Sequence, residues 1–120
     1  MKIIIESFGR KYGVPEADMI LDMRCLENPF WVNGLRELSG LDAPVKEYIF
    51  SNQESAAYVR RLAELLAMQA ELAKERGCEM LHIAVGCTGG RHRSVAVAEY
   101  LADELSEYEI EVIHRDIGKG

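Results

Sequence analysis

The chain has 120 residues, the length of one domain, and its 48% hydrophobic and 28% charged residues argue against an intrinsically disordered protein. A formal net charge of −6 argues against a generic binder of polyanions, because such domains carry an excess of Lys and Arg. Cys25, Cys78 and Cys87 form no CxxC pair, which fits a reducing compartment. We therefore expect a single cytoplasmic domain over residues 1–120, with no membrane segment, no metal-ligand spacing and no cofactor motif.

Short apolar runs separated by turn residues open the chain. Residues 2–8 include three consecutive isoleucines and predict a central strand of a covered sheet. A loop or a very short helix is expected over residues 9–15, where two glycines and a proline interrupt the chain. Residues 19–21 predict a second short strand.

The next segment, residues 25–44, shows no helical or strand period. A loop of this length is unusual in a small domain unless it helps to build a binding site. We expect Phe30 and Trp31 to pin this excursion to the body of the domain by packing, rather than to offer a stacking platform for bases.

Two helices are predicted in the second half of the chain. Ser51-Asn52-Gln53-Glu54 matches a capping box with Ser51 as the N-cap, and Gly77 marks the end of that helix. The second helix is expected over residues 95–105, between strands over residues 81–85 and 109–113. The inward positions expected are Tyr58, Leu62, Leu65, Leu66, Leu72 and Ala73 for the first helix, and Val97, Ala98, Leu101, Ala102 and Leu105 for the second.

The order of these elements predicts the fold class. A strand, a helix and a further strand at the end of the chain imply a parallel pair with a right-handed crossover. We therefore predict an α/β fold, a single small domain with a largely parallel sheet covered by helices. Ligands of such sheets bind beyond the carboxyl ends of the strands. Polar residues expected at this edge, besides the loop described next, are Ser7, Asp22, Arg24, His114 and Arg115.

The segment from Gly86 to Ser94 carries the strongest functional signal. It joins a buried strand to a helix, and the first N–H groups of a helix have no partner within it and favour a phosphate. Gly89 and Gly90 let the backbone approach a ligand closely. This anion-binding loop predicts a phosphorylated small molecule, or a phosphate or sulfate ion, as ligand. The side chains expected to add donors are Thr88, Arg91, His92, Arg93 and Ser94.

The same loop also matches the C-x5-R pattern of tyrosine phosphatases between Cys87 and Arg93. In such enzymes a thiolate at a helix N-terminus attacks the phosphate. Gly86 stands where those enzymes usually carry a histidine, and no residue announces itself as the general acid. Asp22 and Asp116 are the carboxyls that can be nominated for that role. A phosphatase that uses Cys87 is therefore the alternative hypothesis.

Five stretches occur together along the chain, in this order: Glu6-Ser7-Phe8-Gly9 with Lys11-Tyr12-Gly13, Asp22-Met23-Arg24 with Asn28-Pro29-Phe30-Trp31, Leu38-Ser39-Gly40-Leu41-Asp42, Gly86 to Val95, and His114-Arg115-Asp116. Over almost the whole chain, they resemble the C-terminal domain of the RNase adapter protein RapZ family. The resemblance implies a fold like the sugar-phosphate-binding domain of phosphofructokinase. The full-length proteins of that family add an N-terminal P-loop nucleotide-binding domain, and enterobacterial members sense glucosamine-6-phosphate, bind small regulatory RNAs and oligomerise.

Site residues follow from this resemblance. It implies that Asp22 contacts the sugar and that the phosphosugar site consists of Cys87, Thr88, Gly89, Gly90, His92 and Arg93. The histidine of the family's Asn-Pro-His-Trp is Phe30 here, which leaves the identity of the sugar open. The leading hypothesis is a non-catalytic phosphosugar sensor with a regulatory, RNase-adapter-like role. A small-RNA-binding adapter is a second alternative, and partners consistent with these hypotheses are an RNase, a small RNA and further copies of the chain.

Overall fold

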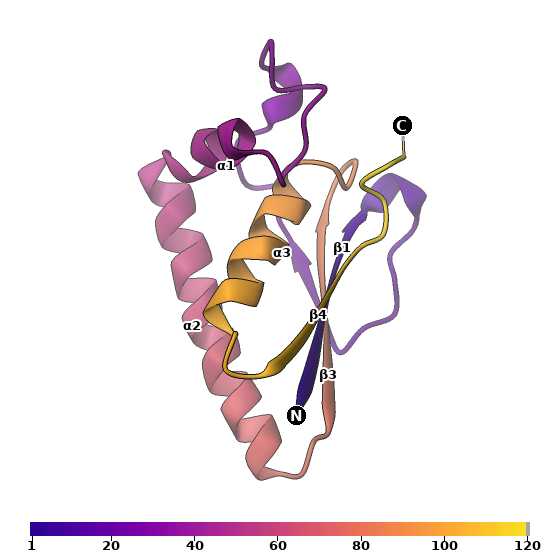
Figure 1. Ribbon diagram of the computed structural model, residues 1–120, viewed down its shortest axis with the longest axis vertical. Coiled ribbons are helices and arrows are strands. Elements are labelled where there is room, and N and C mark those ends of the chain that lie inside the picture. Colours follow the sequence, from indigo (N-terminus) through magenta and orange to yellow (C-terminus); the bar gives the residue numbers. More distant parts are fainter. Residues whose placement is uncertain (120) are drawn as a thin grey trace.

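A computed structural model describes residues 1–119 and shows a four-stranded parallel sheet with helices beside it (Figure 1). The α/β class is therefore confirmed. The strands are β1 (Lys2–Gly9), β2 (Met19–Asp22), β3 (Met80–Cys87) and β4 (Glu109–His114). The helices are α1 (Ala43–Phe50), α2 (Gln53–Glu75) and α3 (Arg93–Glu104), with the single 3-10 turns η1 (Arg10–Tyr12) and η2 (Pro29–Trp31).

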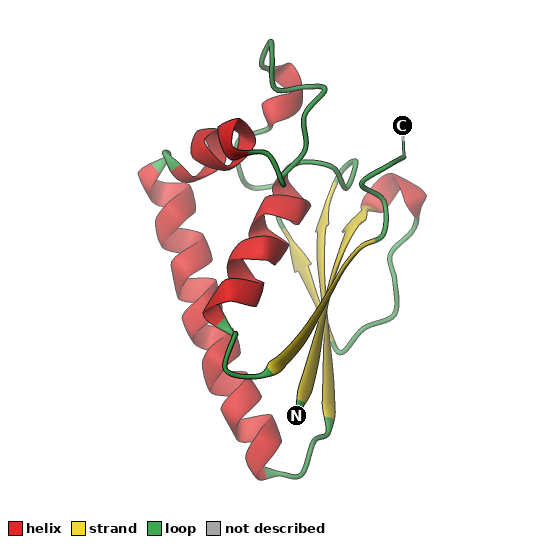
Figure 2. Cartoon of the chain, in the orientation of Figure 1, coloured by secondary structure: helices red, strands yellow, loops and turns green. Residues whose placement is uncertain are grey.

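The first strand lies in the middle of the sheet, whose order is β2-β3-β1-β4. Ile3 and Ile5 point into the core and are fully buried, whereas Ile4 and Glu6 lie on the other face and are half-buried. This alternation follows from the two-residue period of a strand. Helices α2 and α3 lie on the same side of the strands (Figure 2), and their apolar residues share one core with Ile3 and Ile5.

The predicted parallel pair at the end of the chain takes a different form. Strands β3 and β4 are parallel, but β1 lies between them and pairs with both. The register aligns Gly9 with Cys87 and Ser7 with His114. Because all four strands run in the same direction, their carboxyl ends meet at one end of the sheet, where the excursion and the anion-binding loop also lie (Figure 1).

The start of the long helix differs from the prediction. The N-cap of α2 is Asn52, whose Oδ1 accepts a hydrogen bond of 2.9 Å from the N–H of Ser55. Ser51 instead ends α1, a helix that the sequence did not predict. Helix α1 is short and buries only Val45 and Ile49, so its period is too brief to stand out in the sequence. The other end is as predicted, because Gly77 follows the C-cap with a positive φ of 85°.

Helix α2 also turns a different face toward the core than predicted. Its fully buried face consists of Ser55, Val59, Ala63, Leu66 and Ala70. The large apolar residues of the predicted stripe are mostly outside it, since Tyr58 is 44% exposed and Leu65 and Leu72 are each 57% exposed. The helix carries two apolar stripes, and the one with small residues packs against the core because alanines permit a close approach to α3 and the sheet.

The last helix follows the prediction more closely. Val97, Ala98, Leu101 and Leu105 are buried, and Ala102 is half-buried. Helix α3 packs on β1, β3 and β4, which makes it the helix that covers the sheet most directly. None of the helices within residues 1–119 combines the length and the hydropathy that a membrane crossing requires.

The orientation of α2 leads to a prediction about two adjacent leucines. Leu66→Ala should lower the free energy of unfolding by about 2–5 kcal/mol, because the Leu66 side chain is fully buried in the core. Leu65→Ala should change it by less than about 0.5 kcal/mol, because Leu65 is largely exposed. Urea denaturation of the two variants measures the difference. Similar losses in the two variants would show that α2 packs through the stripe predicted from the sequence, because that stripe contains both leucines.

Candidate functional site

A cavity of about 500 Å³ lies at the carboxyl end of the sheet, between the excursion and the anion-binding loop. This volume is within the usual range for small-molecule sites. The loop contributes most of its predicted residues to the wall. The lining residues are Lys11, Asn28, Phe30, Trp31, Arg36, Glu37, Cys87, Thr88, Gly89, Arg91, His92, Arg93 and Lys119.

Glycines shape the floor of the cavity. A Cβ on Gly9 would lie 2.4 Å from the carbonyl carbon of Gly89, and one on Gly90 would lie 2.5 Å from the nitrogen of Gly9. Gly90 also has a φ of 77°, a backbone angle that residues other than glycine rarely adopt. The loop therefore rests directly on the end of β1, backbone against backbone. Gly89 differs from these two, because nothing lies within 4 Å of the position of its Cβ.

Helix α3 begins at Arg93, two residues earlier than predicted, so Arg93 and Ser94 belong to its first turn. The N-cap residue, His92, makes no capping bond with its side chain, and the first turn contains no acidic residue. The positive end of the helix dipole therefore faces the cavity region without a carboxylate from the helix itself.

The guanidinium of Arg93 is buried, with only 5% of the residue exposed. Its Nη1 donates to the carbonyl oxygens of Arg24 (3.0 Å) and Leu26 (3.2 Å), and Nη2 donates to the Thr88 hydroxyl (3.5 Å). Its Nε is buried without a partner. No carboxylate within residues 1–119 forms an ion pair with Arg93. A buried cation without a counter-ion is costly, so this side chain is suited to an external anion.

Arg91 and His92 hold the excursion against the loop. Arg91 donates through Nε to the carbonyl of Leu38 (2.9 Å) and through Nη2 to that of Glu37. His92 Nε2 lies 3.2 Å and 3.1 Å from the carbonyl oxygens of Leu35 and Arg36, so this nitrogen carries the proton. Burial lowers the pKa of His92, and the ring is therefore neutral near pH 7. Both side chains thus donate hydrogen bonds to the excursion.

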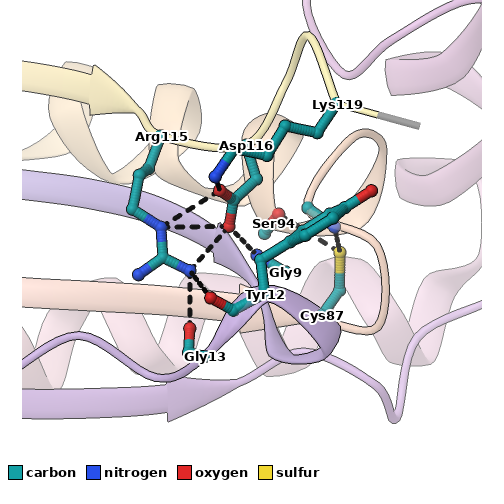
Figure 3. A network of polar contacts seen from close by, with 9 residues as sticks. Gly9, Tyr12, Gly13, Cys87, Ser94, Arg115, Asp116 and Lys119 are labelled. Atoms are coloured by element: carbon teal, nitrogen blue, oxygen red, sulfur yellow. Dashed lines mark hydrogen bonds and ion pairs between the residues drawn. The ribbon is translucent and has the colours of Figure 1, made fainter.

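Cys87 is the last residue of β3 and is 3% exposed. Its Sγ donates to the Ser94 hydroxyl (3.2 Å) and accepts the N–H of Gly90 (3.3 Å), as Figure 3 shows. The position before it is closed to side chains, because a Cβ on Gly86 would lie 2.3 Å from the ring of Phe8. The histidine that phosphatases carry at this position therefore has no room here.

The carboxylate of Asp22 lies outside the cavity lining. It accepts hydrogen bonds from Nε (3.0 Å) and Nη2 (2.7 Å) of Arg24, and Nη2 of Arg10 lies 3.8 Å away. The hydrogen bonds from Arg24 lower the pKa of Asp22 to about 2. Asp22 is therefore ionised near neutral pH and already paired with a cation.

Asp116 is the buried centre of a polar network at the end of β1 (Figure 3). Its carboxylate accepts hydrogen bonds from Arg115 (2.8 Å) and from the N–H of Gly9 (2.8 Å), and it pairs with Lys119 (2.8 Å). Burial alone raises the pKa of Asp116, but these donors together lower it to about 2. Like Asp22, Asp116 is ionised near neutral pH and cannot act as a proton donor there. Instead, it anchors Gly9, on which the loop rests.

Residues 1–118 match the family of the RapZ C-terminal domain. The chain belongs to this family. It is 45% identical over 122 residues to a nucleotide-binding protein of Carboxydothermus hydrogenoformans, covering 99% of this chain and 42% of the relative. It is 50% identical over 113 residues to a nucleotide-binding protein of Thermus thermophilus, covering 92% and 41%. The chain thus spans about two fifths of the length of these relatives.

Some predicted site residues of this RapZ C-terminal domain lie together but away from the cavity lining. Ser7 is fully buried, and its hydroxyl contacts Nδ1 of His114 at 2.7 Å, whose Nε2 lies 2.9 Å from Glu99. This network links β1, β4 and α3. Arg115 is engaged with Asp116 and with the carbonyl of Gly13 (2.5 Å). Neither group lines the cavity.

The predicted role of Phe30 and Trp31 as packing anchors is wrong. Phe30 is 43% exposed and Trp31 is 73% exposed, and both line the cavity. The excursion is instead held by backbone carbonyls that accept from Arg91 and His92, and by Gly40, whose Cβ position is 2.4 Å from the nitrogen of Ala96. Sequence patterns do not reveal such contacts, because every residue supplies a carbonyl.

Sequence reasoning also missed three cations of the lining, Lys11, Arg36 and Lys119. The ammonium groups of Lys11 and Lys119 lie 5.2 Å and 5.0 Å from the centre of the Tyr12 ring, which holds both at the rim. Only Lys11 stands in a stretch that supported the family resemblance. Within residues 1–119, no group of three His, Cys, Asp or Glu side chains is arranged to hold a metal ion.

The network of Asp116 predicts a contribution to stability that depends on pH. The pKa of Asp116 lies below its usual value of 3.8, so the ionised carboxylate stabilises the fold above that pH. This contribution is lost as the pH falls from 3.8 toward about 2. Asp116→Asn should lower the free energy of unfolding at neutral pH by about 1–3 kcal/mol and flatten its decline in acid. Urea denaturation across this range measures both effects.

The matched control is Asp103→Asn, because Asp103 is an exposed carboxylate on α3. We expect this variant to unfold like the wild type at every pH. A wild-type acid profile in Asp116→Asn would contradict the role given to Asp116.

Proposed function

We propose that this domain binds a phosphate ester in the cavity and acts as a regulatory sensor of a phosphorylated metabolite, in the first instance a phosphosugar such as glucosamine-6-phosphate. The observation that carries this proposal is the buried Arg93 guanidinium, which lines the cavity and pairs with no carboxylate of residues 1–119. A phosphate would supply the missing counter-ion through charge-assisted hydrogen bonds.

The charge of the lining supports the same conclusion. Its residues include five Lys or Arg but only one carboxylate, that of Glu37, although the whole chain has a net charge of −6. Of the five cations, Lys119 is paired with Asp116, which lies outside the lining. The cations are therefore concentrated around the cavity. Such local concentration attracts an anionic small molecule without making the surface as a whole attractive to polyanions.

The floor of the cavity offers a place for the phosphate. The first turn of α3 has no side-chain cap, and Gly89 leaves open space where any other residue would place a Cβ. A phosphate there would accept backbone N–H groups at the positive end of the helix, beside the Thr88 hydroxyl and Arg93. The sugar contact of Asp22 stays a prediction from the family resemblance, since Arg24 occupies its carboxylate.

Binding without turnover fits the surrounding groups. Asp22 and Asp116, the two carboxyls nominated as general acids, are both held ionised by their donors, with pKa values of about 2. A general acid must carry a proton near the operating pH. The family resemblance also implies a regulatory role, with RNA and an RNase as partners. We propose this role and these partners for the longer proteins of the family, of which this domain is the C-terminal part.

Gly89→Asp tests the place given to the phosphate. The new carboxylate would occupy the open space at Gly89 and repel an anion, so affinity for a phosphosugar should fall by more than about tenfold. The fold should persist, because no atom lies near the Cβ position. Isothermal titration calorimetry measures the affinity, and thermal unfolding checks the fold.

The control for Gly89→Asp is Gln69→Glu, which adds the same charge at an exposed position of α2. This variant should bind like the wild type. Full binding by a folded Gly89→Asp protein would refute the assignment of the loop.

Cys87→Ser separates binding from catalysis. Serine keeps an acceptor for the N–H of Gly90 and a donor to Ser94, so phosphosugar binding should change by less than about threefold. Neither wild type nor variant should release phosphate from an aryl phosphate ester in a colorimetric assay. Release by the wild type that disappears in Cys87→Ser would contradict the sensor and support the phosphatase.

A further inference from the structure

Part of the cavity wall is aromatic. Phe30 and Trp31 both line it, and Trp31 has 73% of its surface exposed. Exposing an indole to water gains nothing for the fold, because burial of apolar surface is what stabilises a protein. An exposed tryptophan on the wall of a cavity is therefore more readily explained by a ligand than by folding.

The position of the aromatic pair is well defined. Asn28 Oδ1 accepts the N–H of Phe30 at 3.1 Å, and Pro29 occupies the first position of η2. The guanidinium carbon of Arg36 lies 4.9 Å from the centre of the Phe30 ring, and its Nε donates to the Phe30 carbonyl at 2.9 Å. One side of the Phe30 ring is thus in contact with a cation.

Trp31 is oriented by Phe30. The two rings meet edge to face, with centroids 4.9 Å apart and an interplanar angle of 89°. This arrangement is a favoured one for aromatic pairs and holds the indole at a defined angle. The indole itself is left largely exposed, so it presents a flat apolar surface to the same cavity that the anion-binding loop lines.

From this juxtaposition we infer that the ligand is a phosphate monoester that carries a planar aromatic ring, for which a nucleoside monophosphate is the simplest probe. The inference rests on the proposed function, since the phosphate would bind at the same loop, but it assigns an aromatic ester to that site in place of the phosphosugar that the family resemblance implies. The ring would stack on Trp31, as bases do on aromatic side chains. A cavity of about 500 Å³ is far larger than a phosphate ion needs and accommodates both parts.

The composition of the wall favours an aromatic group over a bare sugar. Sugar hydroxyls are selected by polar side chains, and the side-chain oxygens of the lining are those of Glu37, Thr88 and Asn28, of which Asn28 Oδ1 already accepts the N–H of Phe30.

Trp31 provides its own reporter, because it is the only tryptophan of the chain. Adenosine and cytidine monophosphate, glucosamine-6-phosphate and inorganic phosphate would each be titrated while the tryptophan fluorescence and the heat of binding are recorded. We expect the nucleotides to quench the fluorescence and to bind roughly 5- to 150-fold more tightly than the phosphosugar, the factor that one stacked base contributes.

Trp31→Ala should reduce nucleotide affinity by the same factor in calorimetry and leave the affinity for inorganic phosphate unchanged. The fold should be retained, because Trp31 buries little surface. The matched control is Tyr58→Ala, which removes an exposed aromatic ring from α2, outside the cavity lining. This control should bind all four compounds like the wild type.

The possible outcomes separate the two proposals. A phosphosugar that binds as tightly as the nucleotides, with Trp31→Ala unaffected, would overturn the aromatic ligand and leave the proposed sensor standing. A 5′-phosphorylated oligoribonucleotide that outcompetes the mononucleotides would overturn the assignment to a free small molecule. Binding of none of the phosphorylated compounds would refute both the ligand and the proposed function.

Discussion

The close approach of β1 to the anion-binding loop is the constraint on which the rest of the site depends. Gly9 and Gly90 touch backbone to backbone, so neither position accepts a side chain. Asp116 secures this contact by accepting the N–H of Gly9, although the carboxylate is buried and needs Arg115 and Lys119 to compensate its charge. The end of the chain thereby helps to hold the loop in the shape that leaves Gly89 open.

The cations around the loop divide into two groups with different physical roles. Arg91 donates to carbonyl oxygens of the excursion and closes the wall of the cavity. Arg93 also donates to carbonyls, but its buried Nε stays without a partner and its charge without a carboxylate within residues 1–119. Of these two arginines, only two residues apart, Arg91 thus joins two segments of the fold, whereas Arg93 is the one that we propose for anion binding. Only their surroundings distinguish them.

Local sequence signals were sufficient to place an element wherever its own residues alone decided its position. The four strands and the turn at Gly77 lie where propensity and period placed them, and the helix that follows the loop begins two residues earlier than its period predicts. The signals failed where neighbouring residues offer two equally good helix starts or two apolar helix faces. Ser51 and Asn52 are both good N-caps one residue apart, and the tertiary position of α1 selects Asn52. Likewise, α2 carries two apolar stripes, and Leu65 ends outside the core.

The sequence by itself determined the α/β class, the family and the strand–loop–helix that forms the floor of the cavity, because these depend on neighbouring residues and their spacing. Only the tertiary structure decided which donors remain for a ligand, since hydrogen bonds from His92 to distant carbonyls leave no sequence pattern. It also placed Trp31 on the cavity wall instead of in the core. An aromatic residue packs or stays exposed according to what the fold brings beside it, and neighbouring residues do not specify that.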